Sequence, residues 1–359
     1  MSDRSHMDGD LLPASTGAAQ VPPAGEASAP QRPAHLERVP GRAVAVFVAV
    51  SFALAWAVAL PLWLIGQDRP GYQTMFTVFA AAMMFTPLLA TLVVVFVMKV
   101  PSGERLRFLG MWPLRPAKRV VWFIVGALFA PLLLVLACIA VAAAFGWLQL
   151  DLVHFSGFGK MLDEQLAALG SESAAETARA AMPPLGVLIA LQLLVIPFGA
   201  LFNSIMAFGE EIGWRGWLLP ALRPLGVWPA LLLSGAIWGL WHSPLILLGY
   251  NFNRTDWTGV AFMTIGCAIW GVLFGWVRLR SGSVWPAVIG HGALNASAGL
   301  FMLLSAADAP MEMWLVNPLG APGWIVVAVV AAILALTGQF KRQPQLAPSR
   351  RKPRLSQPA

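Results

Sequence analysis

Charged residues are scarce in this chain of 359 residues. Asp, Glu, Lys and Arg together make up 11% of the sequence, whereas soluble globular proteins carry about 25%. Hydrophobic residues reach 58% and the mean hydropathy is +0.70. This composition excludes an ordinary soluble domain, and the length leaves room for several spanning helices of about 20 residues each. We therefore expect an all-α, polytopic membrane protein embedded in a lipid bilayer.

Cysteine is nearly absent, and the positive charge has no pattern that fits nucleic acid. Cys138 and Cys267 each lie alone inside an apolar run, so we expect two buried free thiols rather than a disulfide framework or a cysteine metal site. The net charge is +7, but no basic cluster is interleaved with aromatic residues in a soluble segment. The sequence therefore predicts no nucleic-acid partner.

Two polar tails flank the apolar part of the chain. Residues 1–40 and 341–359 are rich in Pro, Ala, Ser or basic residues and have no apolar period, so we expect them to be disordered. Residues 41–340 should form the transmembrane domain. The expected spanning segments are roughly 43–66, 74–99, 119–148, 185–222, 227–250, 257–278, 284–304 and 320–338.

The fourth apolar segment is too long for one straight span. About 20 residues cross the hydrocarbon core, while 185–222 is far longer. Pro183, Pro184 and Pro197 are places where the helix could begin late or kink.

The basic residues predict the orientation in the membrane. Assigned loop by loop, 20 of the 24 Lys and Arg residues lie on the side of the two tails and 4 lie on the opposite side. Cytoplasmic loops carry the excess of Lys and Arg. We therefore expect a multi-pass protein of the plasma (cell inner) membrane with both termini in the cytoplasm.

Three of the apolar segments carry polar side chains at helical spacing. Residues four apart lie on one face of a helix. Measured along the helices, the first two sets lie at similar depths and the third is somewhat shallower, and we expect one intramembrane polar pocket, open to the cytoplasmic half. The residues concerned are Glu210, Glu211, Arg215, Trp238, His242, His291 and Asn295.

Each of these residues also has a structural interpretation. The two glutamates could end a helix at the interface, where water solvates them, and Arg215 could extend its side chain to the headgroups. A single histidine on a membrane helix often makes a hydrogen bond between helices, and Asn295 could do the same. However, ionisable groups inside a membrane are costly and usually functional, and here they occur on three helices. The pattern favours a functional site.

Together these residues resemble the signature of the CPBP family of intramembrane proteases. That family, often labelled metalloproteases, groups CAAX-prenyl endopeptidases with bacteriocin-processing and self-immunity (Abi) proteins. The order EExxxR, aromatic-xxx-His and HxxxN carries the resemblance, which covers residues 185–304. Trp238 stands where the family usually has Phe. The resemblance implies that Glu211 and Arg215 pair and orient the site.

The same resemblance implies catalytic roles for four residues. Glu210 would be the general base that activates a water, aided by His242. His291 and Asn295 would stabilise the oxyanion of the tetrahedral intermediate. These roles suit peptide hydrolysis, which needs an activated water and donors for the developing negative charge. We therefore expect an endopeptidase that cleaves a membrane-associated protein or peptide.

Zinc remains an open alternative at this stage. Glu210, His242 and His291 could together bind zinc as in open catalytic sites. The HExxH pattern, which places two histidines on one helix, is absent, and water activation by a glutamate needs no ion. Our first expectation is therefore a site without a required cofactor.

Two other classes of protein also fit some of these features. A secondary transporter places charges at the membrane midplane near broken helices, but the polar groups here gather in the second half of the chain only. A non-catalytic immunity or scaffold protein of the membrane is the third interpretation. Proteolysis that depends on Glu210 would separate the enzyme from both.

Overall fold

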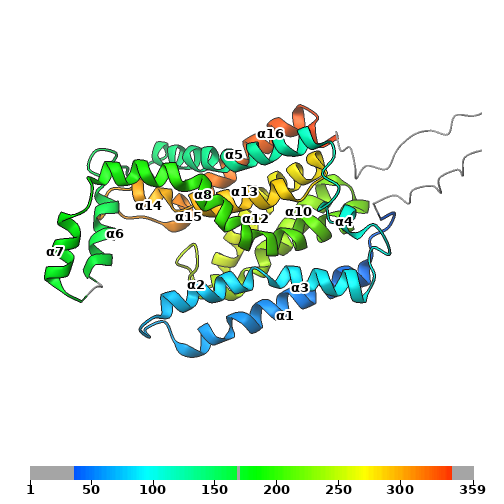
Figure 1. Cartoon of the computed structure of the whole chain (residues 1–359), viewed down its shortest axis with the longest axis horizontal. Helices are drawn as coiled ribbons and strands as arrows, with labels where there is room; N and C mark the ends of the chain where they lie inside the picture. Colours follow the sequence, from blue (N-terminus) through cyan, green and yellow to red (C-terminus); the bar gives the residue numbers. More distant parts are fainter. Residues whose placement is uncertain (1–35, 168–169, 342–359) are drawn as a thin grey trace, which may run out of the picture. The chain divides into compact units, whose positions relative to one another are not determined.

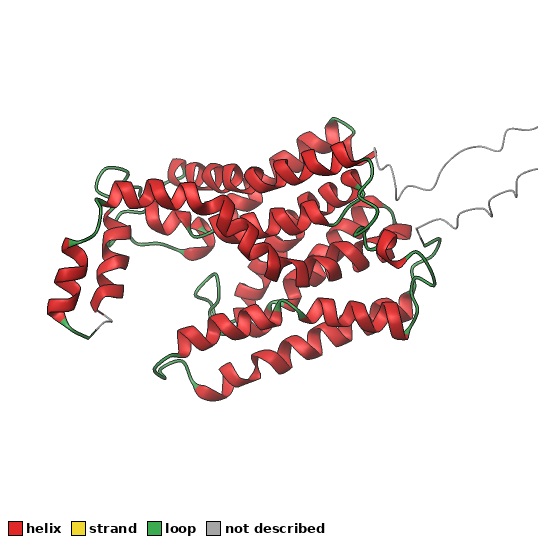
Figure 2. Cartoon of the chain, in the orientation of Figure 1, coloured by secondary structure: helices red, strands yellow, loops and turns green. Residues whose placement is uncertain are grey.

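The computed structural model describes residues 36–167 and 170–341, and every regular element in these ranges is a helix (Figure 2). This confirms the predicted all-α class. The two predicted tails, 1–40 and 341–359, lie outside the described residues except for 36–40 and Lys341.

The helices follow one another along the chain with short connections (Figure 1). One isolated antiparallel bridge, between Leu150 and Ser305, accompanies them in the described ranges. The α-helices are α1 (Gly41–Ile65), α2 (Tyr72–Met83), α3 (Thr86–Leu92), α4 (Arg105–Phe108), α5 (Ala117–Ala144), α6 (Ser156–Ala167), α7 (Glu172–Ala180), α8 (Leu185–Glu211), α9 (Leu219–Leu222), α10 (Val227–Trp241), α11 (Ser243–Ile246), α12 (Trp257–Ser281), α13 (Trp285–Ser297), α14 (Leu300–Leu304), α15 (Met313–Val316) and α16 (Ala321–Leu336). Wider or tighter turns are η1 (Val93–Val97), η2 (Ile212–Leu218), η3 (Arg223–Leu225) and η4 (Gln339–Lys341).

Seven helices of the described chain are long and apolar enough to cross a membrane. Large apolar side chains on their outer faces are exposed, for example Leu133, 64% exposed, and Phe198, 71% exposed, as expected of surfaces that meet lipid. The protein is thus a multi-pass membrane protein. The spans are Gly41–Ile65, Tyr72–Val97, Ala117–Ala144, Leu185–Leu225, Trp257–Ser281, Trp285–Leu304 and Met313–Leu336.

The predicted fifth span, 227–250, is wrong in its length. Helix α10 has 15 residues, about 22 Å at 1.5 Å per residue, while the hydrocarbon core is about 30 Å thick. The helix stops at Trp241, and α11 follows with Pro244 in its first turn. Proline has no backbone N–H and is tolerated in the first turn of a helix, so Pro244 fits the start of a new helix after the break at His242.

Helix α8 begins where the prolines predict. Pro184 is its N-cap and Leu185 its first residue, and Pro197 lies inside it. At its other end the chain passes directly into η2, a π-helical turn. Such wide turns are rare and often mark functional sites.

The bundle has two ends, which we call the tail end and the loop end. At the tail end, Trp217 Nε1 donates to the carbonyl oxygen of Val100 at 2.9 Å. At the loop end, Asn317 Nδ2 donates to the carbonyl oxygen of Asn251 at 3.2 Å. The tail end carries the start of α1, the end of α16 and the connections 98–116, 223–226 and 282–284; the loop end carries the connections 66–71, 145–155, 242–256 and 305–320 (Figure 1).

Small residues let the helices around the polar segments approach closely. A Cβ atom on Gly292 of α13 would collide with the carbonyl oxygen of Ala200 on α8. A Cβ atom on Gly209 of α8 would lie 2.6 Å from the carbonyl oxygen of Met84, at the break between α2 and α3. Such close contacts are typical of helix packing in membranes, and they place α8 between α13 and the break.

Candidate active site

Glu210 lies in the last turn of α8 and is 2% exposed. Its Oε2 atom accepts a hydrogen bond from the Nε1 atom of Trp238 at 2.6 Å and another from Nε1 of Trp214 at 3.3 Å. Trp214 stands four residues further along, in η2, whereas Trp238 comes from α10. Two indoles therefore hold one carboxylate oxygen and fix the orientation of the group.

Glu211 is fully buried and has a different set of partners. Its Oε1 atom accepts from Arg215 Nη1 at 2.7 Å and contacts His291 Nδ1 at 2.9 Å. Its Oε2 atom has no hydrogen-bond partner in the described part of the chain. Glu211 therefore links α8 and η2 to α13.

The Arg215 guanidinium is buried between this carboxylate and two aromatic rings. Its Cζ atom lies 4.3 Å from the ring centroid of Trp238 and 5.3 Å from that of Phe274. A desolvated contact of a cation with an aromatic face contributes about 2 kcal/mol. Trp238 thus contacts both Glu210 and Arg215, the ion-pair partner of Glu211, and so links the surroundings of the two glutamates.

His242 follows the last residue of α10 and is 8% exposed. Its Nδ1 atom lies 2.9 Å from the carbonyl oxygen of Trp238. A carbonyl oxygen only accepts hydrogen bonds, so Nδ1 carries the hydrogen. In the neutral ring the Nε2 atom is then left as an acceptor.

His291 lies on α13 and is 4% exposed. Its ring stacks on Phe274, with centroids 5.7 Å apart, and meets Trp238 edge-on at 5.3 Å. Since Nδ1 faces the Glu211 carboxylate, the Nε2 atom is free of that contact. Asn295 follows one turn later on the same helix and is exposed.

These side chains surround a cavity of about 360 Å³. Of the seven residues predicted from the sequence, five line it: Glu210, Trp238, His242, His291 and Asn295. The other two, Glu211 and Arg215, are buried behind it and contact its lining. The structure therefore brings all seven into one cluster.

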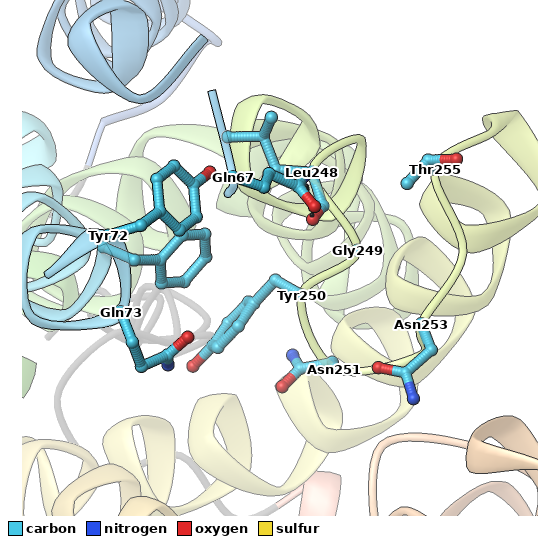
Figure 3. Close-up of a pocket in the computed structure, with 10 residues that line it drawn as sticks. Gln67, Tyr72, Gln73, Leu248, Gly249, Tyr250, Asn251, Asn253 and Thr255 are labelled. Carbon is cyan, nitrogen blue, oxygen red and sulfur yellow. Dashed lines mark hydrogen bonds between the residues drawn. The ribbon is translucent and has the colours of Figure 1, made fainter. Parts of the chain in front are cut away.

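The cavity opens at the loop end, away from the connections that carry most of the basic residues. The predicted opening to the cytoplasmic half stays a prediction, because the structure contains no membrane. A second cavity of about 540 Å³ adjoins the first and shares Gln73, Phe76, Tyr250 and Asn251 with it. This second cavity lies among connections of the loop end, and in Figure 3 the Tyr250 ring extends toward Gln73.

Two contributors to the site were not predicted. Trp214 is four residues after Glu210, so helical spacing could have identified it, but its indole was not distinguished from the many tryptophans of the chain. Tyr250 lines both cavities from a connection after α11. No sequence pattern marks it, because its position depends on the break after Trp241.

Glu210, His242 and His291, the residues of the zinc alternative, all line the cavity. In the part of the chain that the structure describes, no group of three His, Cys, Asp or Glu side chains is placed to hold a metal ion. The carboxylate that contacts His291 is that of Glu211, and Oε2 of Glu210 is occupied by two indole N–H groups.

The sequence comparisons point to one family. Residues 189–297, which include all seven site residues, match the family model described as Type II CAAX prenyl endopeptidase Rce1-like. CAAX prenyl protease 2 from Methanococcus maripaludis is 31% identical over 101 residues, which is 26% of this chain and 37% of that relative. The chain thus spans about a third of the length of the curated relative it matches.

Proposed function

Because residues 189–297 match the Rce1-like CAAX prenyl endopeptidase family model and a CAAX prenyl protease is similar over 101 residues, we propose that the protein is an intramembrane endopeptidase. It hydrolyses a peptide bond in a membrane-associated protein or peptide. The observation that carries this proposal is the carboxylate of Glu210, which lines a cavity inside the membrane-spanning bundle together with His242 and His291. The family match does not favour a transporter or a non-catalytic scaffold.

In the proposed reaction, Glu210 activates a water molecule. The indoles of Trp238 and Trp214 hold its Oε2 atom, so proton transfer uses a carboxylate of fixed orientation. The Nε2 acceptor of His242 supports the same water. The water oxygen bonds to the carbonyl carbon of the peptide, its proton passes to Glu210, and the C–N bond breaks as that proton reaches the leaving amine.

The developing oxyanion needs hydrogen-bond donors. The Nε2 atom of His291, which is free of the Glu211 contact, is the ring atom that would donate to the oxyanion. The side-chain amide of Asn295, one turn away, supplies a second donor. Loss of one oxyanion donor typically costs about 10²–10³ in rate. Glu211 and Arg215 position His291 and Trp238 rather than contact the substrate.

The proposed orientation follows from the basic residues. With 20 of 24 Lys and Arg residues on the side of the tails, both termini lie in the cytoplasm and the protein resides in the plasma membrane. The loop end then faces away from the cytoplasm.

Cleavage-site profiling tests the proposed activity. Membranes that contain the full-length protein or its Glu210→Ala variant are compared for new peptide termini in membrane proteins. Termini that appear with the native protein and vanish with the variant support the proposal, provided the variant accumulates to the same level. Identical termini in both membranes would refute it.

A further inference from the structure

A third cavity, of about 350 Å³, lies between α5, α12, α13 and α16. Its lining side chains are apolar apart from the indole N–H groups of Trp270 and Trp276. Ala130 and Leu133 of α5 line it and are exposed. All four helices belong to membrane-spanning segments, so the cavity opens on the surface that meets lipid. We call it the lateral groove.

The surroundings of the lateral groove supply its occupant. Water is not stable in a cavity that offers it no polar partners, and an empty void loses the dispersion contacts of its walls. An acyl chain of the bilayer is apolar and flexible, and it reaches the depth of the groove. The groove therefore suits one acyl chain of a lipid, and the residues at its tail end decide which headgroup that lipid carries.

Two arginines stand at the tail end of the lateral groove. Phe123 of α5 meets Trp276 of α12 edge-on, with ring centroids 5.5 Å apart. Arg119 precedes Phe123 by one helical turn, and Arg280 follows Trp276 by one turn. Because α5 starts at the tail end and α12 ends there, both guanidinium groups lie beyond the ring contact, where their positive charges act on each other. An anion between them would offset this repulsion.

The helices around the groove provide no such anion. Helices α5, α12, α13 and α16 contain no Asp or Glu, and the Nε atom of Arg119 has no hydrogen-bond partner in the described part of the chain. Arginine binds phosphate through parallel N–H groups, and basic pockets between membrane-spanning helices bind the headgroups of anionic lipids. The charge at this end of the groove therefore fits a lipid phosphate.

Trp276 offers a hydrogen bond between the arginines and the apolar part of the groove. Its Nε1 atom is buried and has no partner among the described residues, whereas Nε1 of Trp270, further from the tail end, donates to the carbonyl oxygen of Pro318 at 2.9 Å. A buried indole N–H usually has an acceptor. The ester carbonyl groups of a glycerophospholipid lie between its phosphate and its chains, so guanidinium, indole and apolar wall follow the same order as the lipid.

We propose that the lateral groove binds an anionic glycerophospholipid, with its phosphate between Arg119 and Arg280, an ester carbonyl at Trp276 and one acyl chain along the apolar walls. This site is separate from the cavity at Glu210, because the two share no lining residue. Lipid binding there does not depend on the proposed endopeptidase activity.

Phe274 connects the lateral groove to the candidate active site. Its ring lines the groove and stacks on His291, with centroids 5.7 Å apart, and the Cζ atom of Arg215 lies 5.3 Å from its centroid. An acyl chain in the groove would also pack against this ring and hold it in place. The bound lipid should therefore stabilise the positions of His291 and Arg215.

Melting temperatures test the binding without any need for activity. The full-length protein is washed in detergent until no lipid phosphorus is extracted from it, and is then titrated with phosphatidylglycerol or with phosphatidylcholine of the same acyl chains. A ligand that binds the folded state raises the melting temperature, so phosphatidylglycerol should raise it at lower concentration than phosphatidylcholine. Equal responses to the two lipids, or no response to either, would overturn the proposal.

The arginine pair has a matched control. A basic residue near a lipid headgroup contributes about fivefold in affinity, so Arg119→Gln with Arg280→Gln should need about 25-fold more phosphatidylglycerol for the same rise. Arg38→Gln with Arg42→Gln removes the same charge from exposed residues at the start of α1 and should respond like the native protein. Equal losses in the two double variants would show that general surface charge binds the lipid, against the proposed site.

The acyl chain is tested separately from the headgroup. Ala130→Phe places a ring in the groove and should abolish the response to phosphatidylglycerol, whereas Ala140→Phe, at an exposed position of α5 outside the groove, should keep it. Glycerol 3-phosphate, which has no acyl chains, should not raise the melting temperature at the same concentrations. If it acts as well as the lipid, the arginines bind a free phosphate and the groove is not a lipid site.

Turnover tests the coupling through Phe274, and this part rests on the proposed endopeptidase function. Glu210-dependent turnover should rise with phosphatidylglycerol over the concentrations that raise the melting temperature, and the Arg119 and Arg280 double variant should need about 25-fold more lipid. Turnover that ignores the lipid would refute the coupling. If no turnover depends on Glu210 while the melting temperatures follow the expected pattern, the endopeptidase function fails and the lipid site stands.

Discussion

At the scale of single residues, two adjacent glutamates have opposite environments. Glu210 lines the cavity and receives hydrogen bonds from two indoles, whereas Glu211 is buried against Arg215 and His291. The spacing of four between Glu211 and Arg215 predicts their contact, and the ion pair at 2.7 Å confirms it. The contact of Glu211 with His291 joins residues 80 positions apart in the sequence. Helical spacing within one segment cannot predict such a contact.

Glu210→Gln should abolish most of the activity without unfolding the protein. The amide keeps the size of the side chain but cannot accept the proton from water. General base catalysis contributes about 10²–10⁴-fold, so turnover should fall by at least that order. Turnover and the detergent melting temperature are measured side by side. A folded Glu210→Gln protein with native turnover would remove Glu210 from the proposed role.

Glu211→Gln should lower stability as well as activity. The change leaves the Arg215 guanidinium buried without its carboxylate, and breaking a buried pair costs about 3–5 kcal/mol. Adding Arg215→Met removes the stranded charge, so the double variant should regain part of the lost melting temperature. If instead Glu210→Gln unfolds the protein and Glu211→Gln is folded but inactive, the two carboxylates have been assigned the wrong way round.

Trp238→Phe should reduce turnover more than it reduces stability. Phenylalanine keeps an aromatic ring near Arg215 but cannot donate to Glu210, and a hydrogen bond to a charged group contributes about 1.5–3 kcal/mol. That corresponds to a loss of roughly 10- to 100-fold in rate. Trp241→Phe is the matched control, because its indole on the same helix donates to the hydroxyl of Thr86 at 3.1 Å. Equal losses in the two variants would argue against a role specific to Trp238.

At the scale of helices, apolar length predicts most of the spans but not their internal breaks. The first, third and sixth predicted segments differ from the observed helices by a few residues, because a long apolar run has few alternatives in a bilayer. The fifth segment was overextended because hydropathy continues through Ser243–Ile246 while the helix does not. Hydropathy identifies an apolar segment but does not show where a helix breaks within it.

Gly209→Ala should destabilise the protein although alanine favours helices. The added Cβ atom would lie 2.6 Å from the carbonyl oxygen of Met84, and overpacking of this kind costs about 1–3 kcal/mol. Gly126→Ala is the control: it lies in α5, and a Cβ atom there meets nothing within 4 Å. The melting temperature should fall for Gly209→Ala and stay or rise for Gly126→Ala. If the melting temperature fell equally in both variants, the contact between position 209 and Met84 would not be the cause of the loss.

At the scale of the whole molecule, the cluster of seven residues was predictable and the access to it was not. Helical spacing and position along each helix predict that the polar groups lie at a similar depth in the membrane. The opening of the cavity depends instead on how α2 diverges from α8 and α13. That divergence begins where segments distant in sequence pack together, at the contact of Gly209 with Met84. Hydrophobic patterns specify which face of a helix is buried and not its tilt against a neighbour.

Chelators should leave the activity of the whole protein largely intact at neutral pH. Glu210 with His242 is proposed to activate water alone, and the described His, Cys, Asp and Glu side chains offer no set of three placed to hold a metal ion. Turnover is measured after chelator treatment, with a zinc-dependent protease treated in parallel. Loss of activity that zinc restores, with stoichiometric metal in the purified protein, would contradict this expectation.

The break between α2 and α3 is the point about which α2 can change its tilt relative to the cavity entrance. Helix α3 packs against α8 and η2, and Gly209 presses against Met84 at the break, so this point is anchored. The 12 residues of α2 extend from it toward the loop end for about 18 Å. A rotation of about 10° at Met84 and Phe85, which α1 would have to follow because it packs against α2, would move Tyr72 by about 3 Å while Glu210 stays in place. Small torsional changes at Met84 and Phe85 would thus change the distance between α2 and the connection 242–256, and so the width of the cavity entrance, without moving the carboxylate of Glu210.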